Sequence, residues 1–185
     1  MQREHMPFYC TVRPVIRAVM HVAVWLILMA AAPCAQAQDY GWFSLDPPRG
    51  WQAEAPSTMA GAWILSLTGP EETVHARIMV GKTAGPPDAA DVAGLLRAAA
   101  GVRESLRRAD AQYVFRGKDA LGVDTACIVG ADPQAGLYMA VLCSGEVDRA
   151  EELLAALRAG SNPAMLPQRH TVRGGIEPHF LPAAQ

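Results

Sequence analysis

The sequence has little charge and almost no charge imbalance. Only 18% of its 185 residues are charged, and 16 basic against 18 acidic side chains leave a formal charge of −2. Because proteins that bind nucleic acid through its phosphates carry a basic surface, this composition argues against nucleic acid as a partner. Apolar residues make up 51% of the chain, which argues against a disordered protein, and the length is typical of one domain.

The apolar run near the N-terminus is too short to span a membrane comfortably. Residues 18–32, AVMHVAVWLILMAAA, follow a basic segment that ends at Arg17, whereas a transmembrane helix needs about 20 apolar residues. We therefore interpret residues 1–37 as a secretory signal peptide. Ala35-Gln36-Ala37 has the small-x-small form of a cleavage site. Cleavage there predicts a mature chain that begins at Gln38 and is periplasmic or secreted.

Three other interpretations of this segment remain open: cleavage after Ala35, an uncleaved membrane anchor, and a lipoprotein acylated at Cys34. Against the last, Pro33 stands where a lipobox has a small residue other than proline. Removal of residues 1–37 leaves about four more acidic than basic residues, which also disfavours an anionic membrane surface as partner. The remaining chain of about 150 residues is long enough for one ordinary core.

Cysteine is scarce, and two of the four cysteines lie in the predicted signal peptide. Cys127 and Cys143 stand in apolar runs on either side of GADPQAG, which predicts a hairpin with its turn over residues 132–136. In that register Cys127 faces Val141, and Cys143 lies two positions along the same face. A bulge or a slightly different turn would bring the two sulfurs together. Since exported proteins form disulfides, we expect a Cys127–Cys143 disulfide, with two buried free thiols as the alternative.

The motifs of common catalytic and metal sites are also missing. His75 is the one histidine of residues 38–162, without a His-x-x-x-His or Cys-x-x-Cys pattern, so we expect no metal and no cofactor. Gly81-Lys82-Thr83 lacks the earlier glycine of a phosphate-binding loop. Ser66 lies near His75 in the expected sheet but has no Gly-x-Ser-x-Gly elbow around it. We therefore expect a protein that is not an enzyme.

Apolar alternation, helical spacing and turn residues predict an α+β fold. Asp88 is a good N-cap for a helix over 89–108, in which Gly101 is a candidate break point, and Asp148 caps a second helix over 149–159. The expected strands span residues 42–45, 62–68, 74–80, 112–118, 123–131 and 137–144. The order β-β-β-α-β-β-β-α indicates one domain with an antiparallel sheet of about six strands and helices packed on it.

The predicted domain covers residues 38–162. Residues 163–185 contain four prolines, a Gly174-Gly175 pair and no apolar period. Such a segment cannot bury enough surface to offset its ordering entropy. We expect a disordered C-terminal tail there.

The element order, with an aromatic strand that runs into Pro47-Pro48-x-Gly50-Trp51, resembles that of the PsbP-like α/β/α proteins and their bacterial periplasmic relatives. The likeness covers about residues 40–160. It implies an α/β/α sandwich and an accessory or binding role, because members of this family are mostly non-catalytic. It supplies no catalytic motif that could be carried over to residues of this chain.

Together these features predict an exported, non-catalytic accessory or binding protein of the cell envelope, whose partner is another envelope or secreted protein. The candidate ligand or partner surface consists of Trp42, Trp51, Trp63, His75 and Arg77. Two alternatives remain: a hydrolase that uses His75, and a carrier of a small apolar ligand that uses the three tryptophans.

Overall fold

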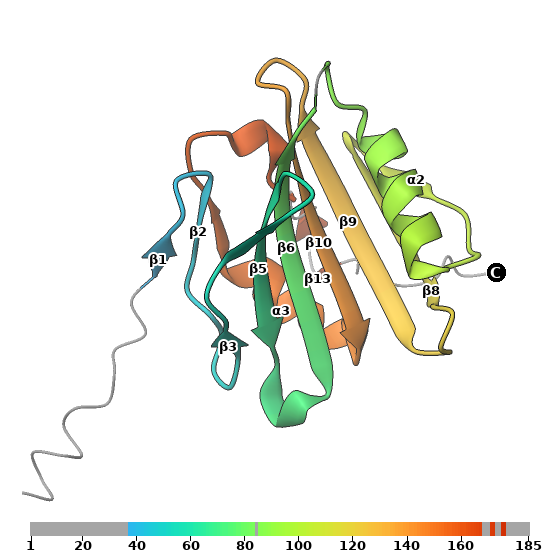
Figure 1. Cartoon of the computed structure of the whole chain (residues 1–185). Helices are drawn as coiled ribbons and strands as arrows, with labels where there is room; N and C mark the ends of the chain where they lie inside the picture. The colour runs from blue at the N-terminus through green and yellow to red at the C-terminus, as the bar shows by residue number, and fades with distance from the viewer. Residues whose placement is uncertain (1–36, 84, 168–170, 173–174, 177–185) are drawn as a thin grey trace, which may run out of the picture. The chain divides into compact units, whose positions relative to one another are not determined.

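The computed structural model describes residues 37–83, 85–167, 171–172 and 175–176, and in the last two pairs the backbone alone. The predicted signal peptide, with the greater part of its cleavage site, therefore lies outside the described residues. The described fold is α+β, with one large antiparallel sheet, a small three-stranded sheet and two α-helices (Figure 1). This confirms the expected fold class.

Eight strands form the main sheet, more than the six expected. Their order is β3 (Gln52–Ala53), β5 (Ala62–Thr68), β6 (Val74–Lys82), β10 (Leu137–Gly145), β9 (Asp124–Asp132), β8 (Gln112–Lys118) and β7 (Arg107–Ala109), and β4 (Ser57–Met59) also pairs with β5. The long strands match the predicted ones closely. The additional strands are the short edge pieces β3, β4 and β7, which have two or three residues each.

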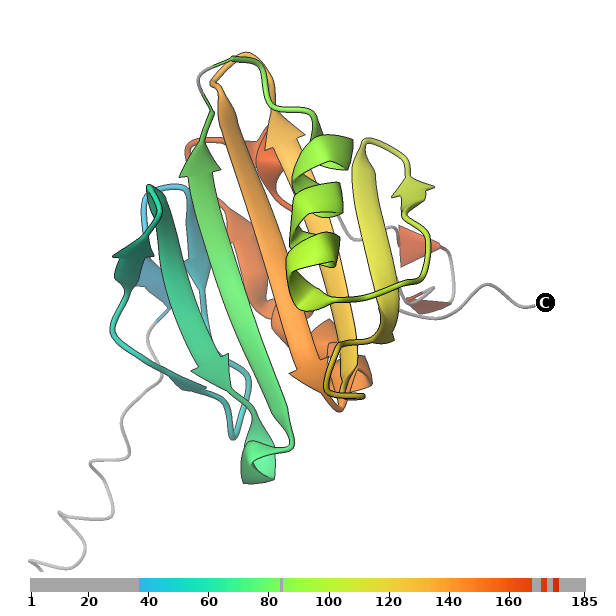
Figure 2. The ribbon, with the colours of Figure 1, turned by 45° about the vertical axis from the view of Figure 1, so that its right-hand side comes forward.

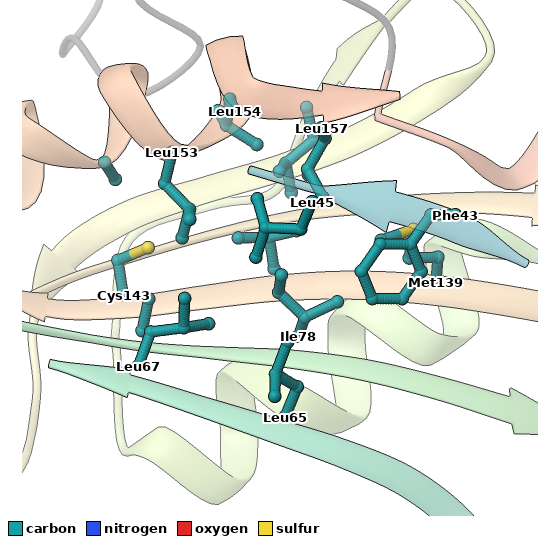
Figure 3. Close-up of a cluster of buried hydrophobic side chains, with 14 of the residues drawn as sticks. Phe43, Leu45, Leu65, Leu67, Ile78, Met139, Cys143, Leu153, Leu154 and Leu157 are labelled. Carbon is teal, nitrogen blue, oxygen red and sulfur yellow. The ribbon is translucent and has the colours of Figure 1, made fainter. Parts of the chain in front are cut away.

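A small sheet and a helix cover one face of the main sheet. The covering elements are β1 (Gln38–Asp39), β2 (Phe43–Leu45), β11 (Leu157–Ala159) and α3 (Ala150–Ala156), which follows the 3-10 turn η2 (Val147–Arg149). Figure 3 shows Phe43 and Leu45 from β2, with Leu153 from α3, pointing toward side chains of the main sheet such as Ile78. All four are fully buried, so this larger core holds the small sheet on the main one.

Helix α2 (Ala89–Ala100) covers part of the opposite face. The carboxylate of Asp88 accepts a hydrogen bond from the Ala90 N–H at 2.8 Å, which confirms the predicted N-cap. The helix ends at Gly101, whose φ of 72° gives the left-handed C-cap conformation. Residues 101–108 were therefore wrongly predicted as helix: after Gly101 the chain turns, and Arg107 begins strand β7.

The last helix and the first strand also differ from the prediction. Asp148 is no helix cap, because its carboxylate instead pairs with Arg116 at 2.7 Å, and α3 begins without a side-chain cap. Leu157–Ala159, expected at the end of this helix, forms strand β11. It pairs with β2, so β2 belongs to the small sheet and not to the six-stranded antiparallel sheet in which we expected it.

Folded structure continues past residue 162, where we expected the tail to begin. Pro163–Met165 forms the 3-10 turn η3, which lies against β9 and β10, and the Met165 side chain is fully buried. A Cβ atom at Gly130 would collide with the Met165 carbonyl, so glycine permits this close approach. Two later pairs, Thr171–Val172 and Gly175–Ile176, form a short antiparallel ladder. Leu166 and Pro167 are also described, and the other residues of the predicted tail lie outside the described part of the chain.

The expected disulfide is absent: Cys127 and Cys143 are buried free thiols. Leu137 pairs with Asp132, so the turn is one residue shorter than predicted and Cys127 faces Leu142. A shift of one residue exchanges the faces of a strand. Cys143 therefore belongs to the core under the small sheet, and Cys127 to the core under α2. Sulfur atoms on opposite faces of one sheet cannot bond without backbone rearrangement.

Both thiols should be unreactive in the folded protein. Burial raises the pKa of Cys143 to about 12, and burial also raises the pKa of Cys127 well above its ordinary value. In the full chain with Cys10 and Cys34 replaced by serine, we expect no reaction with a thiol reagent at pH 8. In denaturant without reductant, the same protein should titrate two thiols. Denatured, unreduced protein without reactive thiols would contradict the register.

Met165 should contribute measurably to stability, although it follows the predicted domain boundary. Replacement of this fully buried side chain should lower the free energy of unfolding by about 2–5 kcal/mol in Met165→Ala. The matched control is Met59→Ala, because Met59 is 64% exposed, and its change should stay within about 0.5 kcal/mol. Urea unfolding followed by circular dichroism measures both. Equal effects of the two substitutions would show that residue 165 does not pack as described.

Candidate functional site

The predicted surface residues do not form one surface. Trp42 and Trp63 lie on the face of the main sheet that the small sheet covers, whereas His75 and Arg77 point from β6 toward the face of α2. Strand alternation explains this split, because odd-numbered residues of β6 point away from the core that Val74 and Ile78 enter. Apolar alternation along Val74, Ala76, Ile78 and Val80 already implies in the sequence that His75 and Arg77 face away from that core.

Trp42 and Trp63 belong to a half-buried aromatic cluster. Their rings meet edge to face with centroids 5.8 Å apart, and Trp63 also contacts Tyr40 at 5.1 Å and Phe43 at 5.7 Å. Such edge-to-face contacts stabilise packing between elements. The cluster joins the loop between β1 and β2 to β5.

Trp51 lies far from this cluster, at the other end of β5. Its ring packs beside Gly69 and Val74, and it is 6% exposed. Six residues of strand separate Trp63 from Gly69, a span of about 20 Å. The three tryptophans therefore do not line one pocket, and this arrangement does not favour the carrier hypothesis that requires all three.

A groove opens on the other face, where α2 leaves part of the main sheet uncovered. The helix packs on β8, β9 and β10, and the sheet continues beside it through β6 and β5 (Figure 2). On this face His75 and Arg77 are exposed, whereas Met79 packs against the core under α2 and Ile64 is buried. The resulting recess has a volume of about 610 Å³, within the range of small-ligand sites. Leu96, Ala99 and Ala100 of α2 form one wall, and Glu54 and Met59 stand on the opposite side.

The floor of the groove changes from polar to apolar along the strands. At one end Thr68, His75, Ser144 and Thr125 form a row across β5, β6, β10 and β9, since each is paired with the next. The row after it places Arg77 between Ser66 and Leu142. In the third row Met79 lies between Ile64 and Ala140. The groove therefore has hydroxyls and two basic groups at one end and apolar side chains at the other.

Arg77 places a full positive charge on this floor. It is exposed and makes no hydrogen bond or ion pair with the residues that the structure describes. Asp119 lies at the rim, where its carboxylate accepts hydrogen bonds from the N–H groups of Leu121 and Val123 at 2.8 and 2.9 Å. Glu54 is the other carboxylate of the lining. The floor itself is thus basic, and its two carboxylates stand at the edges.

His75 does not have the surroundings of a catalytic base. Its Nδ1 lies 3.4 Å from the Thr68 hydroxyl, and among the described residues it has no hydrogen bond to a carboxylate that would orient the ring. Ser66 is a diagonal neighbour on the next strand, which places its Cα about 7–8 Å from that of His75. A nucleophile and a base act together at hydrogen-bond distance. This geometry gives the hydrolase hypothesis no specific support.

A second recess, of about 640 Å³, lies where β10 leads into η2. Its charged side chains bind one another: Arg116 pairs with Asp148 at 2.7 Å, and Arg149 lies 3.6 Å from Glu146. Charges that are already paired are less available to a ligand. In the described part of the chain, no group of three or more His, Cys, Asp or Glu side chains is placed to hold a metal ion.

Sequence reasoning missed most of the groove. Thr68, Ser144 and Met79 were not identified as site residues, although alternation along each strand already implied that they face the same side as His75 and Arg77. What the sequence did not provide was the order of the strands. That order places β10 directly beside β6, and so brings Ser144 next to His75.

Comparison with family models, curated proteins and solved structures gave no match to this chain. The resemblance to PsbP-like proteins therefore stays an expectation from the sequence. Within the described residues, no helix is both long and apolar enough to cross a membrane.

The role of His75 can be tested directly. Because its side chain is exposed and has one contact at 3.4 Å, His75→Ala should change the free energy of unfolding by less than about 0.5 kcal/mol. Turnover on a panel of esters and peptides should be the same in the variant and the unaltered protein. A saturable activity that is lost in His75→Ala but retained in Lys82→Ala would establish the hydrolase alternative.

Proposed function

We propose that this protein is an exported, non-catalytic binding protein of the cell envelope, and that it binds another envelope or secreted protein through the groove between α2 and β5–β6. The observation that supports this proposal is that α2 covers only part of one face of the main sheet. A sheet normally buries its faces against other elements, whereas His75 and Arg77 of β6 remain exposed on the face that α2 covers in part.

The composition of the groove is that of a binding surface. It combines apolar side chains such as Met79 and Leu142 with hydrogen-bonding groups and with Arg77, which has no ion pair or hydrogen bond within the described part of the chain. Protein interfaces likewise combine apolar and polar parts, and they are enriched in arginine and methionine. The exported location is supported by the sequence of residues 1–37 alone.

The groove also supports binding better than catalysis. Ser66 and His75 share its floor, but they are diagonal neighbours, and the closest partner of the imidazole is the Thr68 hydroxyl. The tryptophan-based carrier has less support than the groove, because Trp51 lies at the opposite end of β5 from Trp63. Neither alternative is favoured by a specific observation.

Site-specific photocross-linking in the cells that make the protein tests this proposal. Benzoylphenylalanine replaces Ser66 on the groove floor or, as control, the exposed Lys82, which lies on the other face of the main sheet. Illumination should produce one dominant protein adduct from position 66 and a several-fold weaker one from position 82. Equal adducts from both positions, or none from position 66, would contradict the proposal.

A further inference from the structure

The open part of the main sheet has room for one helix. Neighbouring strands are about 4.8 Å apart, so β5 and β6, with the uncovered side of β10, offer a strip about 10 Å wide. An α-helix with its side chains has a diameter of about 10–12 Å. Helix α2 covers the adjacent strip of the same face (Figure 2). A second helix beside α2 would therefore complete this layer.

The facing side of α2 permits such an approach. Ala99 and Ala100 carry only methyl groups, and they line the groove with Leu96. Small side chains allow two helix backbones to come close to one another. On the opposite side, Glu54 and Met59 border the groove at the edge strands β3 and β4. The groove is thus bounded on both sides at a spacing that fits one rod-shaped element.

The polarity of the floor defines the chemistry of that element. Arg77 and His75 lie toward one end of the floor, with Glu54 and Asp119 at its edges, and the partly buried Met79 and the buried Ile64 lie at the other end. Burial of an unpaired guanidinium under an apolar partner would be costly, whereas a carboxylate opposite it would form a charge-assisted pair. Charge complementarity therefore requires an acidic residue at the polar end and apolar residues at the other.

We propose that the partner element in this groove is a single amphipathic α-helix that lies beside α2, with an acidic side chain opposite Arg77 and apolar side chains opposite Met79. This inference rests on the proposed function and identifies the part of the partner that binds. Arg77 lies on the floor next to the apolar end, so it determines which end of the bound helix carries the acidic side chain. Glu54, on the edge wall, faces the outer side of that helix.

Two cross-linking positions test the helix and its direction. Benzoylphenylalanine replaces Thr68 at the polar end or Met79 at the apolar end; the two rows are about 13 Å apart along the strands. Mass spectrometry then identifies the attached residues of the captured protein. We expect two sites in one segment about nine residues apart, the spacing of a helix over that length. The site joined to position 68 should lie within one turn of an Asp or Glu.

Charge reversal tests the acidic contact. Arg77→Glu in the full chain with benzoylphenylalanine at position 66 should lower the yield of the adduct at least about tenfold, and Arg77→Lys should retain most of it. The matched control is Lys82→Glu, on the same strand but on the other face of the sheet. It makes the same change from a basic to an acidic residue and should leave the yield within about twofold. Thermal unfolding of each variant verifies that it is folded.

The outcomes separate this inference from the proposed function. If position 66 captures one protein but Arg77→Glu leaves the yield unchanged, the helix inference is wrong and the proposed function stands. The same holds if the two sites are about four residues apart, as in an extended strand. Cross-links to a second copy of this chain or to lipid would likewise overturn the inference. If position 66 gives no protein adduct, the helix inference and the proposed function are both wrong.

Discussion

Alternate side chains of β10 pack into two different hydrophobic cores, one on each face of the main sheet. Most of the structure depends on this constraint. It pairs with β6 on one side and β9 on the other along its whole length. Met139, Val141 and Cys143 enter the core under the small sheet, while Ala140 and Leu142 face α2. Because a slip of one residue would exchange these two sets, the register is strongly specified. The same alternation directs His75 and Arg77, on the neighbouring strand, into the groove.

The hairpin before β10 shows how this register is set. Asp132 accepts hydrogen bonds from the N–H groups of Gln134 and Ala135, each at 3.1 Å, in a turn typical of aspartate. These bonds stabilise the charged carboxylate, and the one from Ala135 is the main cause of the lowered pKa of Asp132. The side chain thereby closes the turn at residues 133–136. The sequence signal identified the hairpin but not its length, and that difference of one residue separates the two cysteines.

Elements that carry their own periodicity could be predicted from the sequence, and those defined by distant partners could not. Strands β5 and β8 have the predicted bounds, because alternation and flanking turn residues are local signals. Leu157–Ala159 continues the pattern of a helix and becomes a strand only because β2 lies beside it. At the site, the outward direction of Arg77 was readable from β6 alone. The position of Trp51 could not be predicted in this way, because it depends on the path that the chain takes between the two sheets.

The pairing of β2 with β11 joins the beginning and the end of the described fold, since Leu45 lies opposite Leu157. Contacts between such distant parts of a chain form late and slow the folding reaction. During synthesis, β2 has only the two-residue strand β1 as a partner until β11 has been made. A chain released before that point would expose the part of the larger core that β2 and β11 cover. Folding of this domain is therefore completed only after β11 has been made, and a chain truncated before β11 is left open to proteolysis and aggregation.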